Sequence, residues 1–158
     1  MKKFELTSEF VTFLGKKLFR IKALVSFGDV KEGELGGLVE KEENLDQSGN
    51  AWVSGNAWVS GDARVSGDAR VYGNAWVSGD ARVQNCRDYS ATSCFGSGNR
   101  TTTFFRTKDG GISVRCGCFY GTLAEFREKV KERHGGRRLA KEYLMLADLM
   151  EFRLSKDE

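Results

Sequence analysis

Six hexads follow one another without a gap from Gly49 to Gln84, reading GNAWVS, GNAWVS, GDARVS, GDARVY, GNAWVS and GDARVQ. In every hexad an Ala stands two residues before a Val, so on an extended chain both side chains lie on one face. The Trp or Arg between them points to the other face, and the Gly-Asn or Gly-Asp pair favours a tight corner. Each hexad therefore predicts one short strand and one corner.

The repeat resembles the hexapeptide-repeat left-handed parallel β-helix, in which three hexads form one triangular coil. The resemblance implies about two coils, with residues 18 apart stacked in register. An interior of Ala and Val alone buries too little apolar area to offset the chain entropy, and each open end exposes unpaired strand edges. We therefore expect caps or partner subunits to cover the coils.

The outer faces of the coils carry the three Trp residues of the chain. The 18-residue stacking places Trp58 over Trp76 on one face and Trp52 over Arg70 on another. Contiguous exposed apolar side chains usually mark an interaction site. We interpret Trp52, Trp58 and Trp76 as the subunit interface of a homo-oligomer, with a trimer expected. An aromatic platform for a flat ligand is the alternative.

The N-terminal part, residues 1–44, predicts a β-hairpin over 11–24 followed by a cap. Val39 and Leu45 are six residues apart and in phase with the Ala column, so the coil is expected to begin here in degenerate form. Residues 17–84 are also similar to a group of bacteriophage and prophage proteins that share the run FRI, GDVK, GELGG, VEKEENL and GNAWV. This resemblance implies a phage origin and names no activity.

The repeat, assigned to residues 45–84, gives way to a C-terminal domain over 85–158 that we expect to be α+β. The runs TTTFFRT and ISVRCGCF flank Lys-Asp-Gly-Gly, which predicts a β-hairpin. Thr122 and Glu125 have the spacing of a capping box, and a second helix is predicted from about 138 to 154. The predicted fold is therefore mainly β, with a short β-helix and a hairpin backed by two antiparallel helices.

A ligand site is predicted at the loop from Gly96 to Thr102 and on the adjoining strands. Glycines let backbone N–H groups close around an anion, and Arg and Thr side chains add further donors. Residues 85–158 also carry 14 Lys and Arg against 10 Asp and Glu, so this part favours anions. The predicted ligand-binding residues are Arg100, Thr102, Phe104, Phe105, Arg106 and Arg115.

Two kinds of chemistry are considered and set aside. Cys86, Cys94, Cys116 and Cys118 offer four thiolates for zinc, but their spacing matches no known ribbon or finger, so we predict neither metal nor cofactor. Hexapeptide-repeat proteins include many acyltransferases, which usually take a His from a coil as general base. The one His of this chain, His134, lies outside the repeat.

The sequence thus predicts a phage-type, non-enzymatic homo-oligomer that sequesters a small anionic, nucleotide-like ligand. The alternatives are an adaptor that binds another protein through its Trp face and a relative of the acyltransferases. No apolar run approaches the ~20 residues that span a bilayer, and no signal peptide is evident. We expect the bacterial cytoplasm as its location, and neither membrane nor nucleic acid as a partner.

Overall fold

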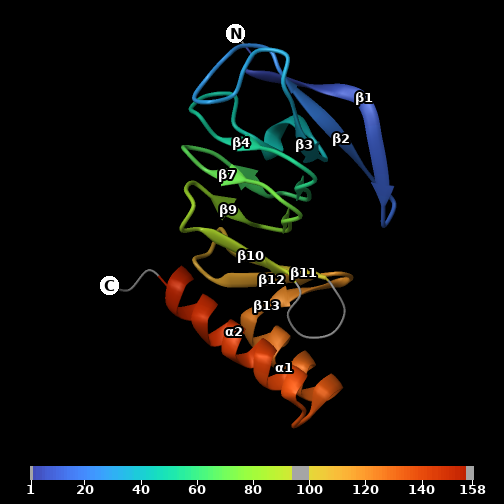
Figure 1. Ribbon diagram of the computed structural model, residues 1–158, viewed down its shortest axis with the longest axis vertical. Coiled ribbons are helices and arrows are strands. Elements are labelled where there is room, and N and C mark those ends of the chain that lie inside the picture. Colours follow the sequence, from blue (N-terminus) through green and yellow to red (C-terminus); the bar gives the residue numbers. More distant parts are fainter. Residues whose placement is uncertain (1, 94–99, 156–158) are drawn as a thin grey trace.

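The computed structural model describes residues 2–93 and 100–155, which form an elongated stack of layers. Figure 1 shows the N-terminal loops at one end, the N-terminal hairpin along one side of the repeat, and a sheet backed by two helices at the other end. The longest dimension runs through all the layers, and each layer packs on the next.

The hexads form the short strands that their sequence predicts. Each strand pairs in parallel with the one 18 residues later, so that Val53 lies beside Val71 and Val65 beside Val83. The strands are β4 (Trp52–Val53), β5 (Trp58–Val59), β6 (Arg64–Val65), β7 (Arg70–Val71), β8 (Trp76–Val77) and β9 (Arg82–Val83). The stacked strands are β4 on β7, β5 on β8 and β6 on β9.

The interior of the repeat consists of the Ala and Val columns, whose members are all at most 1 % exposed. The glycines that open the hexads have φ between 62° and 73°, the left-handed region that a side chain disfavours. A Cβ on Gly67 would also lie 2.7 Å from the carbonyl oxygen of Gln84. Backbone conformation and the close approach of neighbouring strands both therefore require glycine at this corner.

The N-terminal part extends one face of the repeat into a five-stranded sheet with the order β1-β2-β3-β5-β8. Its first members are β1 (Phe4–Phe13), β2 (Lys16–Ala23) and β3 (Leu35–Val39), so the hairpin begins seven residues before the predicted Val11. The expectation that the coil begins near Val39 and Leu45 is confirmed. Val39 pairs with Val59 and Leu45 bridges to Val65, so these residues stack on the Val column and not the Ala column.

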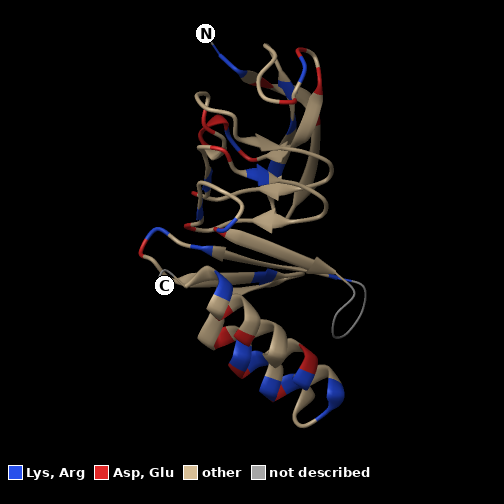
Figure 2. Ribbon diagram, turned by 60° about the vertical axis from the view of Figure 1, so that its left-hand side comes forward, with Lys and Arg blue, Asp and Glu red and all other residues tan. Residues whose placement is uncertain are grey.

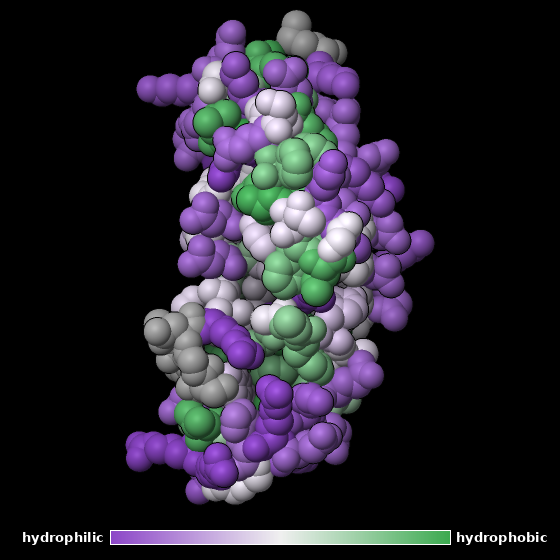
Figure 3. Space-filling view, turned by 90° about the vertical axis from the view of Figure 1, so that its right-hand side faces the viewer, coloured by the Kyte–Doolittle hydropathy of each residue, from purple (hydrophilic) through white to green (hydrophobic). Residues whose placement is uncertain are grey.

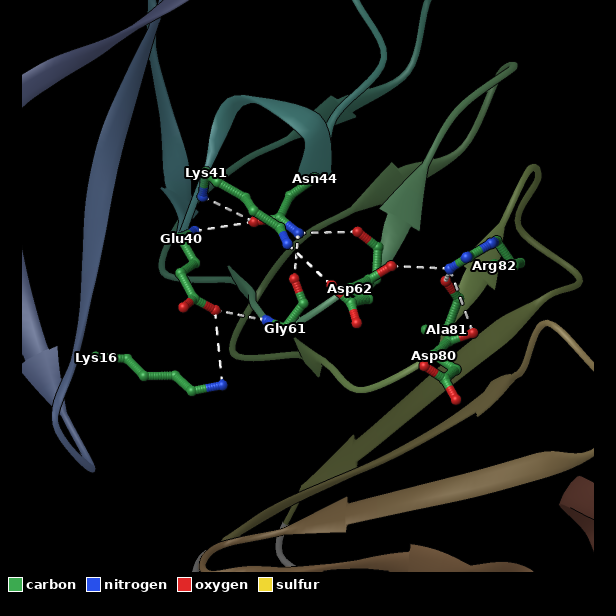
Figure 4. Close-up of polar contacts among 10 residues, drawn as sticks. Lys16, Glu40, Lys41, Asn44, Gly61, Asp62, Asp80, Ala81 and Arg82 are labelled. Atoms are coloured by element: carbon green, nitrogen blue, oxygen red, sulfur yellow. Dashed lines mark hydrogen bonds and ion pairs between the residues drawn. The ribbon is translucent and has the colours of Figure 1, made fainter.

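A buried asparagine fastens this cap to the repeat. Asn44, at the end of the 3-10 turn η1 (Glu42–Asn44), is fully buried. Its Nδ2 donates to the carbonyl oxygens of Gly61 and Ala63 at 3.1 and 2.9 Å, and its Oδ1 accepts from the backbone N–H groups of Glu40 and Lys41 (Figure 4). The side-chain amide of Asn44 therefore makes all four of its hydrogen bonds to buried or partly buried backbone groups.

Buried Lys3 closes the N-terminal end. It is only 4 % exposed. Its Nζ donates to the carbonyl oxygen of Ala51 at 2.8 Å and, at 3.4 Å, to those of Ser48 and Gly49. The same Nζ lies 4.8 Å from the ring centroid of Phe27. Burial lowers the pKa of Lys3 to about 8, against a smaller opposing effect of a nearby carboxylate.

The C-terminal part is an antiparallel sheet of four strands with two helices on one face. The strands are β10 (Tyr89–Ser93), β11 (Thr101–Arg106), β12 (Ile112–Cys116) and β13 (Phe119–Thr122). The predicted hairpin corresponds to β11 and β12. The sequence predicts no strand in the segment that contains β10. The strand β13 begins at Phe119, the last residue of the predicted second strand of the hairpin. Thr122 caps α1 (Leu123–His134) through the predicted capping box, and α2 (Arg138–Leu154) follows.

No helix in the described ranges is long and apolar enough to cross a membrane.

The repeat covers one face of this sheet and the two helices cover the other. Neighbouring residues of β11 point to opposite faces and so enter different cores. Phe105 belongs to the core of the repeat, and Phe104 to the separate core under the helices. Tyr89 also enters the end of the repeat and donates to the carbonyl oxygen of Arg70 at 2.6 Å. The C-terminal sheet therefore caps the open end of the repeat, as β1, β2 and β3 cap the other.

Replacing Asn44 by Ala should destabilise the fold by about 2–4 kcal/mol, because it leaves buried backbone groups without partners. Urea unfolding measures the loss. Asn50→Ala serves as the control, since Asn50 is exposed at a hexad corner, and it should change stability by less than about 0.5 kcal/mol. Equal effects of the two substitutions would contradict a fastening role for Asn44.

Lys3 should make stability depend on pH. Its folded pKa of about 8 lies below its ordinary value of 10.5, so between these values the unfolded chain holds a proton that the folded chain has released. The free energy of unfolding therefore rises with pH in this window. The difference between the wild type and Lys3→Met should grow by about 2 kcal/mol from pH 7 to pH 10. A difference that is constant with pH would contradict this prediction.

Candidate functional site

The Trp column of the repeat lies beside the N-terminal hairpin. Trp58 and Trp76 pair in register, with ring centroids 4.9 Å apart. Phe13, the last residue of β1, packs against both indoles at centroid distances of 5.3 and 4.9 Å. Both indoles nevertheless remain partly exposed. The hairpin therefore covers one part of the column and leaves another part open.

Arg115 reaches the same column from the C-terminal sheet. The central carbon of its guanidinium lies 3.7 Å from the ring centroid of Trp76, a cation–π contact. Burial lowers the pKa of Arg115 from its ordinary value, although a guanidinium stays charged at neutral pH. Its Nε is buried and has no hydrogen-bond partner among the described residues.

Two hollows meet at this contact. One of about 540 Å³ extends along the Trp column toward the C-terminal sheet, and one of about 240 Å³ extends toward the tip of the hairpin. Phe13, Trp76 and Arg115 line both. Figure 3 shows this side of the molecule, where apolar side chains gather along the middle and hydrophilic ones border them. We call the two hollows the Trp groove, with Phe13, Trp58, Trp76, Arg100 and Arg115 as its main walls.

The Trp groove carries an excess of positive charge. Its larger hollow is lined by Arg20, Arg100 and Arg115, and no described Asp or Glu lines it. The Nε of Arg20 is 3.0 Å from a carboxylate oxygen of Glu9, so its charge is compensated. Arg100 and Arg115 take part in none of the ion pairs among the described residues. Two guanidinium groups are therefore available to an anion in the groove.

Two asparagines add neutral amides to the same wall. Asn56 and Asn74 are the second residues of two Trp-bearing hexads, and both line the larger hollow. Every hexad that carries Arg opens with Gly-Asp instead. Carboxylates at these two corners would repel an anion, so the amides favour the same ligand charge as the guanidinium groups. The pairing of Asn with Trp marks both hexads of this face, and it also occurs in the first hexad, whose Trp52 lies on another face.

The structure corrects the prediction for three residues of β11. Phe104 and Phe105 are fully buried, so neither offers a face to a ligand. Thr102 is 1 % exposed, and its hydroxyl donates to the sulfur of Cys116 at 3.3 Å. The physical reason is that the sheet lies between the repeat and the helices. Neighbouring residues of β11 therefore enter one core or the other.

Arg106 is also directed away from the Trp groove. Its Nε donates to the carbonyl oxygen of Leu154 at 2.7 Å, and its Nη1 is 3.2 Å from a carboxylate oxygen of Asp88. It therefore joins the sheet to the end of α2. Of the six predicted ligand-binding residues, the structure brings only Arg100 and Arg115 to the groove. Residues 96–99 of the predicted loop lie outside the described residues.

Trp52 does not lie on an exposed outer face. It is 1 % exposed, with Phe27 packed on its ring at a centroid distance of 5.4 Å. A Cβ on Gly36 would lie 2.7 Å from the Trp52 ring, which shows how closely β3 covers it. The connection between β2 and β3 therefore buries this Trp within the chain. The double variant of Trp58 and Trp76 described below decides between the predicted subunit interface and a ligand site at this column.

The remaining reactive side chains are dispersed. Among the residues that the structure describes, no three His, Cys, Asp or Glu side chains gather as a metal would require. Cys86, Cys116 and Cys118 are free thiols, and Cys94 lies outside the described residues. His134, at the end of α1, stacks on Tyr143 at a centroid distance of 5.8 Å.

Comparison with known families supports the repeat. Residues 63–79 match the family model of the YdcK beta solenoid repeat. The chain contains a β-solenoid repeat. A comparison with curated proteins finds no match. The solenoid segment explains the regular pairing of β4–β9, and the hairpin and the C-terminal sheet beside it form the groove.

Replacing Trp58 and Trp76 together by Ser should lower stability by about 2–5 kcal/mol, because both rings pack within their own chain. The molar mass from light scattering should stay at the wild-type value. Tyr72→Ser is the control, since Tyr72 is 63 % exposed on the solenoid and should tolerate the change. A smaller molar mass with an unchanged melting temperature would instead support a subunit interface at the Trp column.

Proposed function

We propose that this protein is a non-enzymatic binding protein whose Trp groove sequesters a small anionic ligand with a flat ring, such as a nucleotide. The contact between Arg115 and Trp76 carries the proposal. It places a charged donor beside an aromatic face at the junction of two hollows. A phosphate accepts hydrogen bonds from a guanidinium group, and a base stacks on an indole.

The groove suits binding more than catalysis. Its larger hollow is lined mainly by guanidinium, amide, aromatic and aliphatic side chains. Guanidinium and amide groups donate hydrogen bonds, but they do not gain or lose a proton near neutral pH. General acid–base catalysis depends on groups that take up and release protons near that pH. Acyl transfer is not favoured either, because His134 stacks on Tyr143 at the far end of α1.

The proposal includes the finer features that the two resemblances imply. The solenoid is then left-handed with about two regular coils, and the protein comes from a phage and acts as a homo-oligomer in the bacterial cytoplasm. A phage gains from binding nucleotide signals of host defence, because sequestration ends the signal without any chemical step. An adaptor role at the Trp face is less favoured, since Phe13 covers part of that face.

Retention of nucleotides tests the proposal. The protein is mixed at micromolar concentration with AMP, ADP-ribose and cyclic diadenylate, filtered, and then heat-denatured to release what was bound. We expect at least one nucleotide to be retained and released chemically intact. Retention of none would contradict the proposal, and release of an altered product would show an enzyme.

Arg115→Gln should weaken binding of the retained nucleotide at least tenfold, because one charge-assisted hydrogen bond contributes about 1.5–3 kcal/mol. Arg64→Gln is the matched control. Arg64 is an exposed arginine on another face of the solenoid, and it lines neither hollow of the Trp groove. Affinity should also fall with added salt, because partly exposed ion pairs are screened. Equal losses in the two variants would place the ligand elsewhere.

A further inference from the structure

A second basic hollow lies on the other side of Arg100. It has a volume of about 60 Å³, and aromatic rings of Phe119, Phe126 and Tyr143 line it. Its polar lining comes from Arg100, Lys129, Arg133 and His134. Arg100 lines both this hollow and the larger part of the Trp groove. The Arg100 side chain is therefore shared by two hollows that are both lined by aromatic residues.

Local structure explains why these groups meet. Lys129 and Arg133 are four residues apart on α1 and so lie on one side of the helix, next to the buried Val130. Gly117, in the turn between β12 and β13, lines the Trp groove. A Cβ on Gly117 would lie 3.4 Å from Cδ and Nη1 of Arg100, so the Arg100 side chain lies on this turn. The turn thereby brings Arg100 between the groove and α1.

The cations at this second hollow are not neutralised by the chain itself. On the same helix Arg127 binds Asp148 and Glu151, and Lys131 lies 3.8 Å from Glu128. Neither Lys129 nor Arg133 takes part in an ion pair among the described residues. Figure 2 shows Lys and Arg interspersed with Asp and Glu along both helices. Lys129 and Arg133, which line the hollow beside Arg100, are therefore not neutralised by an ion pair among the described residues.

We infer that the ligand is a dinucleotide, which extends from the Trp groove past Arg100 to this second hollow. This inference rests on the proposed function and specifies its ligand class. One base stacks at Trp58 and Trp76, the phosphate that joins the two units lies at Arg100, and the second unit lies against the rings between Lys129 and Arg133. The second hollow admits only part of a ring, so the second base lies across its opening.

Three probes separate this inference from the proposed function: AMP, ADP and the linear dinucleotide pApA. ADP resembles pApA in negative charge but has one base. We expect pApA to bind at least tenfold more tightly than either mononucleotide in isothermal titration calorimetry. The double variant Lys129→Gln with Arg133→Gln should remove most of that advantage and leave the affinity for AMP within about twofold. Lys131→Gln is the control on the same helix and should change neither affinity.

Each outcome distinguishes the two claims. Equal affinities for ADP and pApA, or an equal loss of AMP and pApA binding in the double variant, would overturn the dinucleotide inference and leave the proposed function standing. Binding of none of the three probes at micromolar protein would overturn the dinucleotide inference, and it would contradict the proposed function as well if ADP-ribose and cyclic diadenylate are not retained either. Unchanged pApA binding in the double variant would show that the second hollow takes no part. Circular dichroism spectra and melting temperatures confirm that all variants are folded.

Discussion

The thin interior of the solenoid is the constraint on which the rest of the structure depends. Only Ala and Val fill the space between the paired strands, and an interior of such small side chains buries little apolar area per residue. The solenoid cannot therefore be stable with open ends. The described chain closes both ends itself, with β1, β2 and β3 at one and the C-terminal sheet at the other.

The two caps also create the site. The hairpin extends beyond the end that it covers and brings Phe13 to the Trp column, while β12 brings Arg115 to the same column from the opposite end. Because both caps meet the exposed face of β5 and β8, hollows remain where they do not touch. The repeat supplies the aromatic surface of Trp58 and Trp76. The C-terminal part supplies the positive charges of Arg100 and Arg115. Neither part alone contains the proposed binding groups.

The repeat could be predicted from the sequence because every hexad has the same pattern of Gly, Ala and Val. The alternation of residues along each hexad predicted the buried Ala and Val columns, and the Gly residues predicted the corners. The capping box at Thr122 predicted the start of α1. The pairing of Val39 with Val59 could not be predicted from phase alone. Leu45 and Val53 are eight residues apart where hexads are six apart, and these two extra residues shift the register onto the Val column.

The candidate site was less predictable, because it depends on how separate layers pack. The sequence predicts Phe104 and Phe105 as stacking faces, because it predicts a hairpin with helices on one face only. In the structure both faces of the sheet are covered, so the two rings enter two different cores. Trp52 was hidden for a related reason, since no local pattern shows that a loop carrying Phe27 folds over it. The nearness of Arg115 to Trp76 likewise joins segments that only the tertiary fold brings together.

The three tryptophans provide the most direct test of the proposed Trp groove. A ¹H–¹⁵N spectrum separates their indole N–H signals, and pApA is added in steps to the full-length protein. The signals of Trp58 and Trp76 should move with the added ligand, because these rings line the groove. The signal of Trp52 should stay in place, because this ring is buried beneath Phe27. Binding of pApA that leaves Trp58 and Trp76 unmoved would contradict the account.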